Sequence, residues 1–220
     1  MLGTLLVALL LSQIPTSEPV TTGKQPAKPA PAKASYPTEP IVFEEHVDKK
    51  GGFKISLPPS QGKPWSAVDY TWVRDAQHQY KGRQLHAEAA GGVQIWIEWY
   101  DQPDGVKARG VAFRAEESWL KQLGVSREKA GLKGLIRGGY IGGSFKFNVD
   151  PRELAKDNPQ LLATLANSAP EDLIVTHCGL VISTDDRAYL LRASCPSTHP
   201  DCERMLNEFI NSFDLLSVAK

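Results

Sequence analysis

Apolar and polar residues alternate along several short stretches of the chain, a pattern that predicts β-strands. The first such stretch is 53–57, which ends at two consecutive prolines. A second strand is expected within residues 70–80. Residues 83–100 predict a hairpin, because two consecutive glycines at 91–92 supply the permissive backbone of a turn.

Both faces of the second arm of this hairpin carry large apolar side chains. Successive side chains of a strand point to opposite sides of the sheet. One face therefore holds Val93, Ile95, Ile97 and Trp99, and the other holds Gln94, Trp96, Glu98 and Tyr100. We expect both sides of the sheet to be covered, at least in part.

Residues 172–195 predict a second hairpin, with Asp185 and Asp186 as its two-residue turn. With this turn, an apolar face pairs Ile182 with Tyr189, Leu180 with Leu191 and Cys178 with Ala193. The opposite face carries His177, Val181, Leu190 and Arg192. Because both faces are largely apolar, this hairpin is expected at the centre of the sheet.

Helical spacing of apolar residues occurs in two other places. Residues 115–124 predict a short amphipathic helix, with Glu116 and Glu117 in its first turn. A last helix is expected to begin near 200–201, with a core-facing stripe of Met205, Leu206, Phe209, Ile210 and Phe213. Residues 134–149 predict strand interrupted by paired glycines, and Pro151 predicts a helix start. Strands and helices that do not strictly alternate favour an antiparallel α+β sandwich.

Composition limits the kinds of partner that the chain can have. The chain has 220 residues, enough for one sizeable core, and equal numbers of basic and acidic residues, 25 of each. There is no net field to attract nucleic acid, so no nucleic-acid partner is expected.

The N-terminal part of the chain predicts export. Residues 2–11 form an apolar run of the length of a signal-peptide core, too short to span a bilayer. We predict a signal peptide or short anchor at 1–17; a buried or fraying helix is the alternative. A linker rich in Pro, Ala and Lys follows at 18–40, then a single domain at 41–216 and a tail at 217–220. The expected location is the bacterial periplasm, the cell envelope or the extracellular space.

Three segments of this domain together resemble the PsbP-like family. They are the early strand "GFKISLPPSQGKPW", the late strand "RAYLLRASCP" and the helix end "FINSFDLL". The resemblance covers about residues 41–216. It implies a twisted antiparallel sheet with helices packed on both faces, acting as a binding or adaptor module rather than an enzyme. It carries over no active-site residue.

Two cysteines near the C-terminus raise the question of a disulfide. In an exported chain, Cys195 and Cys202 are expected to form one. Closing a loop of about eight residues would stabilise the fold by roughly 2.5 kcal/mol in the chain-entropy model. Inert free thiols remain an alternative. A reactive Cys202 in the first turn of a helix is another. Cys178 is expected to stay a buried free thiol, although it too could pair with Cys195.

Candidate binding and catalytic residues lie on the first hairpin. His86, Glu88 and Glu98 form the one cluster that could collect a metal or perform acid–base chemistry, although polar residues in register are more often a solvated face. Aromatic residues are overused at interfaces. Core packing is the favoured interpretation of the tryptophans and of Tyr100; if any is exposed, Trp96 and Tyr100 are the first candidates for a binding surface.

These patterns favour an exported, non-enzymatic domain that binds another protein or an envelope assembly, with no cofactor and no catalytic or metal residue assigned. Two alternatives remain: a secreted hydrolase or small-ligand enzyme near His86, Glu88 and Glu98, and a structural or stress-related envelope protein. No stable membrane span is expected unless the N-terminal segment is retained.

Overall fold

The computed structural model describes residues 41–60, 64–75, 78–89, 92–101, 108–156, 159 and 173–216. The expected signal peptide or anchor, the linker and the tail lie outside the described residues. Within these ranges no helix combines the length and the apolar character needed to cross a bilayer.

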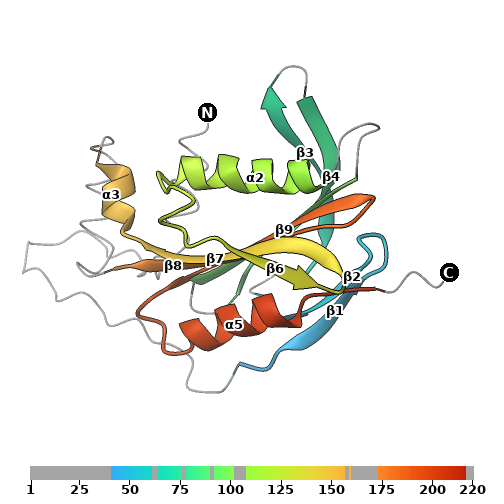
Figure 1. Ribbon diagram of the computed structural model, residues 1–220. Helices are drawn as coiled ribbons and strands as arrows, with labels where there is room; N and C mark the ends of the chain where they lie inside the picture. The colour runs from blue at the N-terminus through green and yellow to red at the C-terminus, as the bar shows by residue number, and fades with distance from the viewer. Residues whose placement is uncertain are drawn as a thin grey trace, which may run out of the picture.

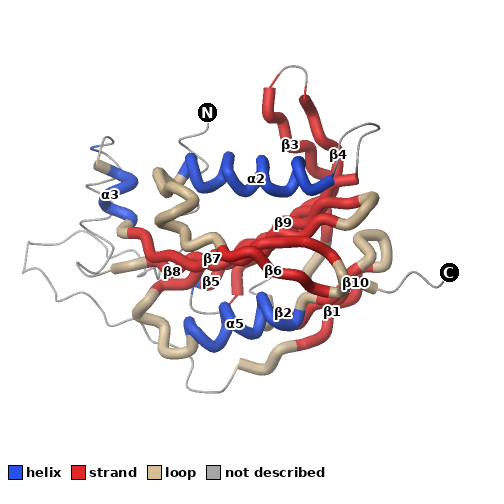
Figure 2. Tube along the Cα trace, in the orientation of Figure 1, coloured by secondary structure: helices blue, strands red, loops and turns tan. Residues whose placement is uncertain are grey.

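Two antiparallel sheets and three helices make up the described fold (Figures 1 and 2). The strands of the larger sheet follow the order β3-β4-β5-β9-β8-β7-β6, and those of the smaller one β1-β2-β10. The strands are β1 (Glu44–Asp48), β2 (Phe53–Leu57), β3 (Ala67–Asp75), β4 (His78–Ala89), β5 (Val93–Asp101), β6 (Lys133–Arg137), β7 (Tyr140–Val149), β8 (Val175–Ser183), β9 (Arg187–Pro196) and β10 (Asp214–Leu215). The helices are α2 (Ala108–Gln122), α3 (Pro151–Ala155) and α5 (Cys202–Ser212). The predicted α+β class with antiparallel strands is confirmed.

The larger sheet has an apolar cluster on each of its faces. On one face, buried residues of β5, β8 and β9 pack with α5 and β2. On the other face, Val181 and Leu190 pack with buried residues of α2, among them Ala112 and Leu120. Figure 1 shows α2 and α5 on opposite sides of the sheet.

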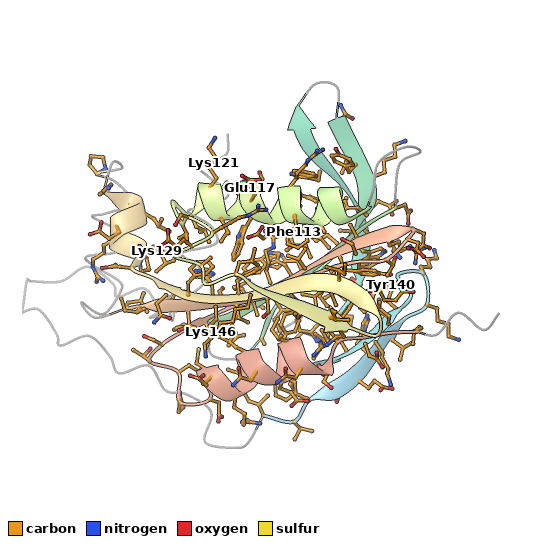
Figure 3. The ribbon with its side chains drawn as sticks, viewed as in Figure 1. Phe113, Glu117, Lys121, Lys129, Tyr140 and Lys146 are labelled. Carbon is orange, nitrogen blue, oxygen red and sulfur yellow. The ribbon has the colours of Figure 1, made fainter. Side chains whose placement is uncertain are left out.

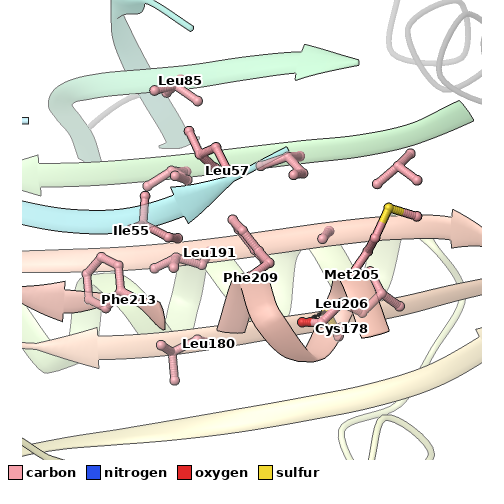
Figure 4. Packing of buried hydrophobic residues seen from close by; sticks show 14 of the residues in the cluster. Ile55, Leu57, Leu85, Cys178, Leu180, Leu191, Met205, Leu206, Phe209 and Phe213 are labelled. Atoms are coloured by element: carbon pink, nitrogen blue, oxygen red, sulfur yellow. Dashed lines mark hydrogen bonds between the residues drawn. The ribbon is translucent and has the colours of Figure 1, made fainter. Parts of the chain in front are cut away.

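The apolar stripe of α5 determines how this helix packs. Met205, Leu206 and Phe209 are each about 1% exposed, while Ile210 lies partly buried at the edge of the cluster. Figure 4 shows the stripe facing Leu180 and Leu191 of the large sheet, beside Ile55 and Leu57 of β2. The predicted core-facing stripe is confirmed.

The β8–β9 hairpin has the predicted register and the predicted central place. Ile182 pairs with Tyr189, Leu180 with Leu191 and Cys178 with Ala193. Its turn is closed by the Thr184 N–H, which donates to the Arg187 carbonyl at 2.8 Å. Three strands lie beyond β9 (β5, β4 and β3) and two lie beyond β8 (β7 and β6). Both strands of the hairpin therefore have a paired neighbour on each side.

Three details differ from the sequence-based expectations. Strand β1 was not predicted, because its residues alternate only weakly between buried and exposed positions. The stretch 70–80 is not one strand: β3 ends at Asp75 and β4 begins at His78. Helix α2 begins at Ala108, so Glu116 and Glu117 lie in its middle and not in its first turn.

A buried histidine lies between the sheet and α2. The His177 ring on β8 stacks on Phe147 at 5.3 Å between centroids and meets Trp119 edge-on at 5.7 Å. Burial lowers the pKa of His177 to about 3, so this ring is neutral at physiological pH.

This burial makes stability depend on pH. Between about pH 6.5 and pH 3, His177 binds a proton only in the unfolded chain, so the free energy of unfolding falls as the pH falls. We predict that His177→Gln removes about 1.4 kcal/mol of that loss per pH unit below 6.5. Urea unfolding of both proteins at several pH values measures it. Parallel pH profiles would contradict the prediction.

Candidate functional site

The β6–β7 hairpin forms one edge of the larger sheet. Its two-residue turn, Gly138–Gly139, has φ angles of +56° and +83°. Positive φ at both positions is the requirement of the type I′ turn that suits the twist of a hairpin, and glycine meets it without strain. The glycine pair was predicted to mark a bend, and the structure shows a tight turn there.

A hollow of about 700 Å³ lies beside this edge, between the hairpin and α2. Its lining is mostly apolar and comprises Phe113, Leu132, Gly134, Leu135, Ile136, Ile141, Gly142 and Gly143. Ile136 is 78% exposed and Ile141 is 48% exposed. The two isoleucines are cross-strand partners, so their side chains share one face of the hairpin.

Two glycines explain the open space at this edge. Gly134 and Gly143 are cross-strand partners on the same face as the isoleucines. A Cβ atom on Gly134 would meet no atom within 4 Å, whereas one on Gly143 would lie 3.0 Å from Leu132 and 3.5 Å from Phe113. The hollow is therefore filled near Gly143 and empty in front of Gly134.

Hydrogen bonds and an ion pair on the two faces of the sheet fix the residues around the hollow. Arg127 donates to the Phe113 carbonyl at 2.7 Å and pairs with the buried Glu116 at 2.9 Å. Burial raises the pKa of Glu116, and Arg127 opposes that shift. Figure 3 shows Phe113 on the side of α2 that faces the hairpin. On the opposite face, Arg137 donates to the carbonyls of Ile210 and Phe213 at the end of α5.

Trp96 and Tyr100, the first candidates for an exposed binding surface, are buried. Trp96 is 7% exposed and Tyr100 is not exposed at all. The side chains of α2 and β3 cover this face of β5, and Trp72 of β3 packs near Tyr100. The idea of an aromatic binding surface at these two residues is therefore wrong, and the core-packing interpretation holds.

Glu98 is buried within a network of hydrogen bonds, at 3% exposure. Its carboxylate accepts from Gln84 at 3.0 Å, from the Tyr100 hydroxyl and from Arg192. The Arg192 guanidinium lies over the rings of Trp119 and Trp96, at 5.3 and 5.9 Å from their centroids. Burial lowers the pKa of Arg192 to about 10, which leaves it charged at neutral pH. This arrangement satisfies a buried charge pair and joins β5 to β9.

His86, Glu88 and Glu98 lie on the same face of the paired strands β4 and β5, with Glu98 in the Arg192 network described above. His86 stacks on Trp96 at 4.9 Å and hydrogen-bonds Gln94, while Glu88 pairs in register with Gln94. Burial lowers the pKa of His86. In the part of the chain that the structure describes, no group of three His, Cys, Asp or Glu residues could hold a metal ion.

All three cysteines are buried free thiols in this structure. The Cys195 thiol donates to the Pro196 carbonyl at 3.4 Å, and the neighbouring Cys195 thiol lowers the pKa of Cys202. Burial raises the pKa of Cys178 to about 12, and its thiol points at the Leu206 carbonyl, 3.8 Å away. The two predicted disulfide partners are thus adjacent, and the disulfide itself stays a prediction.

The hollow was not predicted from the sequence. The residues that line it on β6 and β7 were interpreted only as strand and bends, because a glycine by itself does not indicate whether the space beside it is filled. The available signal was the pairing of Ile136 with Ile141 across a two-glycine turn, with further glycines two residues beyond each.

Comparison with known proteins finds only distant structural likenesses. No family model matches the sequence, and no curated protein matches it. A crystal structure from Bacteroides thetaiotaomicron aligns with a TM-score of 0.40 and 8% identity over 80% of this chain and 49% of that one. The Ran-binding protein Mog1p of Saccharomyces cerevisiae aligns with a TM-score of 0.41 and 12% identity over 80% of this chain and 97% of that one. The chain therefore spans about half the length of the first structure. Both likenesses are to the fold, and membership of the PsbP-like family stays a prediction.

The buried charge pair leads to a prediction about stability. Arg192→Met leaves the Glu98 carboxylate buried without its cation, and we expect it to lower the free energy of unfolding by about 3–5 kcal/mol. Adding Glu98→Gln removes the unpaired charge and should restore part of the loss. Urea unfolding of both variants measures this. A loss below about 1 kcal/mol in Arg192→Met would mean that the pair behaves like an exposed one.

The adjacent thiols lead to a second prediction. In protein taken from its native host and alkylated in denaturant without reductant, we expect one modified cysteine, Cys178, and a disulfide between Cys195 and Cys202. Intact mass and peptide mapping give the count and the pairing. Three modified thiols would contradict the disulfide and favour a reducing compartment.

Proposed function

We propose that this chain is an exported, non-enzymatic domain that binds another protein through the β6 edge of its larger sheet. The observation that carries the proposal is the pair of exposed isoleucines beside the apolar hollow. Exposed apolar groups that surround a concave surface are typical of interaction sites.

The shape of the edge supports a protein partner over a small molecule. The hollow is continuous with an open strand edge, and strand edges offer backbone groups that another chain can pair with. The lining has no acidic, basic or histidine side chain that would direct a reaction. An adaptor role also agrees with what the PsbP-like resemblance implies.

The residues that suggested an enzyme make contacts typical of a packed sheet. Glu98 accepts hydrogen bonds from three donors, and His86 stacks on Trp96 and hydrogen-bonds Gln94. Export is supported by the apolar run at 2–11 alone. The mass measurement described above also tests export, because a processed chain lacks about the first 17 residues.

The site is tested by placing a charge on it. We predict that Ile136→Asp abolishes capture of the partner from an extract of the native host, because it puts a carboxylate on the apolar rim of the hollow. The matched control is Val68→Asp, on the edge strand at the other end of the sheet, where Val68 is 58% exposed. Capture should be retained in that control. Equal capture by both variants, with unchanged thermal unfolding, would exclude the β6 edge.

A further inference from the structure

Resting on the function proposed above, we propose that the partner contributes an extended segment of alternating acidic and apolar residues, which adds as a strand to β6. Its apolar side chains occupy the hollow beside Gly134 and Ile136. Its acidic side chains lie on the opposite face, beside Lys133.

The backbone of β6 has free groups for such a strand. In a hairpin with a two-residue turn, the residues next to the turn, Arg137 and Tyr140, exchange backbone hydrogen bonds. Bonding then alternates along the strand, so Leu135 and Lys133 also bond to β7. Gly134 and Ile136 therefore direct their N–H and C=O groups away from β7. Among the described residues, no other strand pairs with this edge.

The two faces of β6 differ in chemistry, and this difference defines the occupant. Gly134 and Ile136 lie on the face of the hollow. Lys133, Leu135 and Arg137 lie on the other face. Lys133 is exposed, Leu135 also lines the hollow, and Arg137 already donates to two carbonyls at the end of α5, so Lys133 is the basic group left for a carboxylate. An incoming strand also alternates between faces, so apolar side chains on one side and carboxylates on the other complement both.

Charge around the edge favours an acidic partner. The hairpin, residues 133–149, contains three basic residues and no acidic one; of the three, Lys146 already pairs with Glu203 of α5, which leaves Lys133 and Arg137 nearest the edge. Over residues 108–149 there are eight Lys and Arg against three Glu, in a chain that is neutral as a whole. Figure 3 shows Lys129 and Lys146 near the end of the hairpin that lies away from Tyr140 and the turn. Complementary charge of this kind promotes encounter and selects the partner.

Two other occupants fit less well. The chain's own segment 18–40 contains six prolines, which have no backbone N–H for strand pairing. It also contains three lysines against two glutamates, so its charge does not complement a basic edge. A second copy pairing through β6 would bring two sets of Lys133 and Arg137 together, and like charges across paired strands are destabilising.

The experiment uses the full chain and two labelled seven-residue peptides, measured by fluorescence anisotropy. One peptide is Glu-Val-Glu-Ile-Glu-Val-Glu, and the other has Lys in place of each Glu. We expect the acidic peptide to bind, at least tenfold more tightly than the basic one. On binding, the amides of Gly134 and Ile136 should become protected from hydrogen exchange in the unmodified protein.

Three variants separate the contributions. Gly134→Pro removes an outward N–H without removing a bond to β7 and should weaken binding at least tenfold. Lys133→Glu should weaken it about fivefold, while Lys81→Glu, at an exposed position on β4, should not. If Gly134→Pro does not fold, the exchange of the Gly134 and Ile136 amides decides alone.

The other outcomes overturn the inference in recognisable ways. Equal binding of both peptides, or unprotected Gly134 and Ile136 amides, excludes addition of an acidic strand. If Ile136→Asp still abolishes partner capture, the proposed function then stands without this mode of binding. A dimer of the full chain that dissociates in Gly134→Pro would assign the edge to a second copy.

Discussion

Burial of both faces of the β8–β9 hairpin is the constraint on which the rest of the fold depends. Leu180 and Leu191 point to the cluster under α5, while Val181 and Leu190 point to the cluster under α2. A strand pair that is apolar on both faces is stable only when something covers each face. The two helices and the small sheet meet this need, and α5 follows the hairpin after a short connection.

The charged groups between the sheet and α2 are compatible with this burial because they are paired, although single polar atoms such as His177 Nδ1 and the Tyr80 hydroxyl have no hydrogen-bond partner in the described residues. Glu98 is held by Arg192, and the guanidinium lies against aromatic rings that are themselves packed. His177 avoids the cost of a buried charge by staying neutral. The α2 side of the sheet is therefore a mixed polar and aromatic layer, while the α5 side is almost wholly apolar. Glu98, Trp96 and Tyr100, which suggested a catalytic site or an aromatic surface in the sequence, are part of this buried layer.

Local sequence predicts the elements of this fold better than it predicts exposure. The register of β8–β9 follows from one turn and strict alternation, and the stripe of α5 follows from helical spacing. Tyr100 is buried against α2 and β3, and Trp96 lies between His86 of β4 and Arg192 of β9, so their burial depends on other parts of the chain. Likewise, Glu98 meets Arg192 only because β5 and β9 pair, 94 residues apart in sequence. Short-range patterns contain none of this information.

The open edge follows from the same packing constraint. Toward β6 the α2-side layer thins, since glycines replace the larger side chains found on β7 as Phe145 and Phe147. Because Gly134 has no side chain, the space between α2 and β6 is not filled there. Ile136 keeps most of its surface exposed to solvent. A Cβ atom at position 134 would meet no atom within 4 Å, so packing of the described residues leaves room for at least an alanine there. The packing of the described residues leaves the hollow beside Gly134 unfilled, and a binding partner can occupy it.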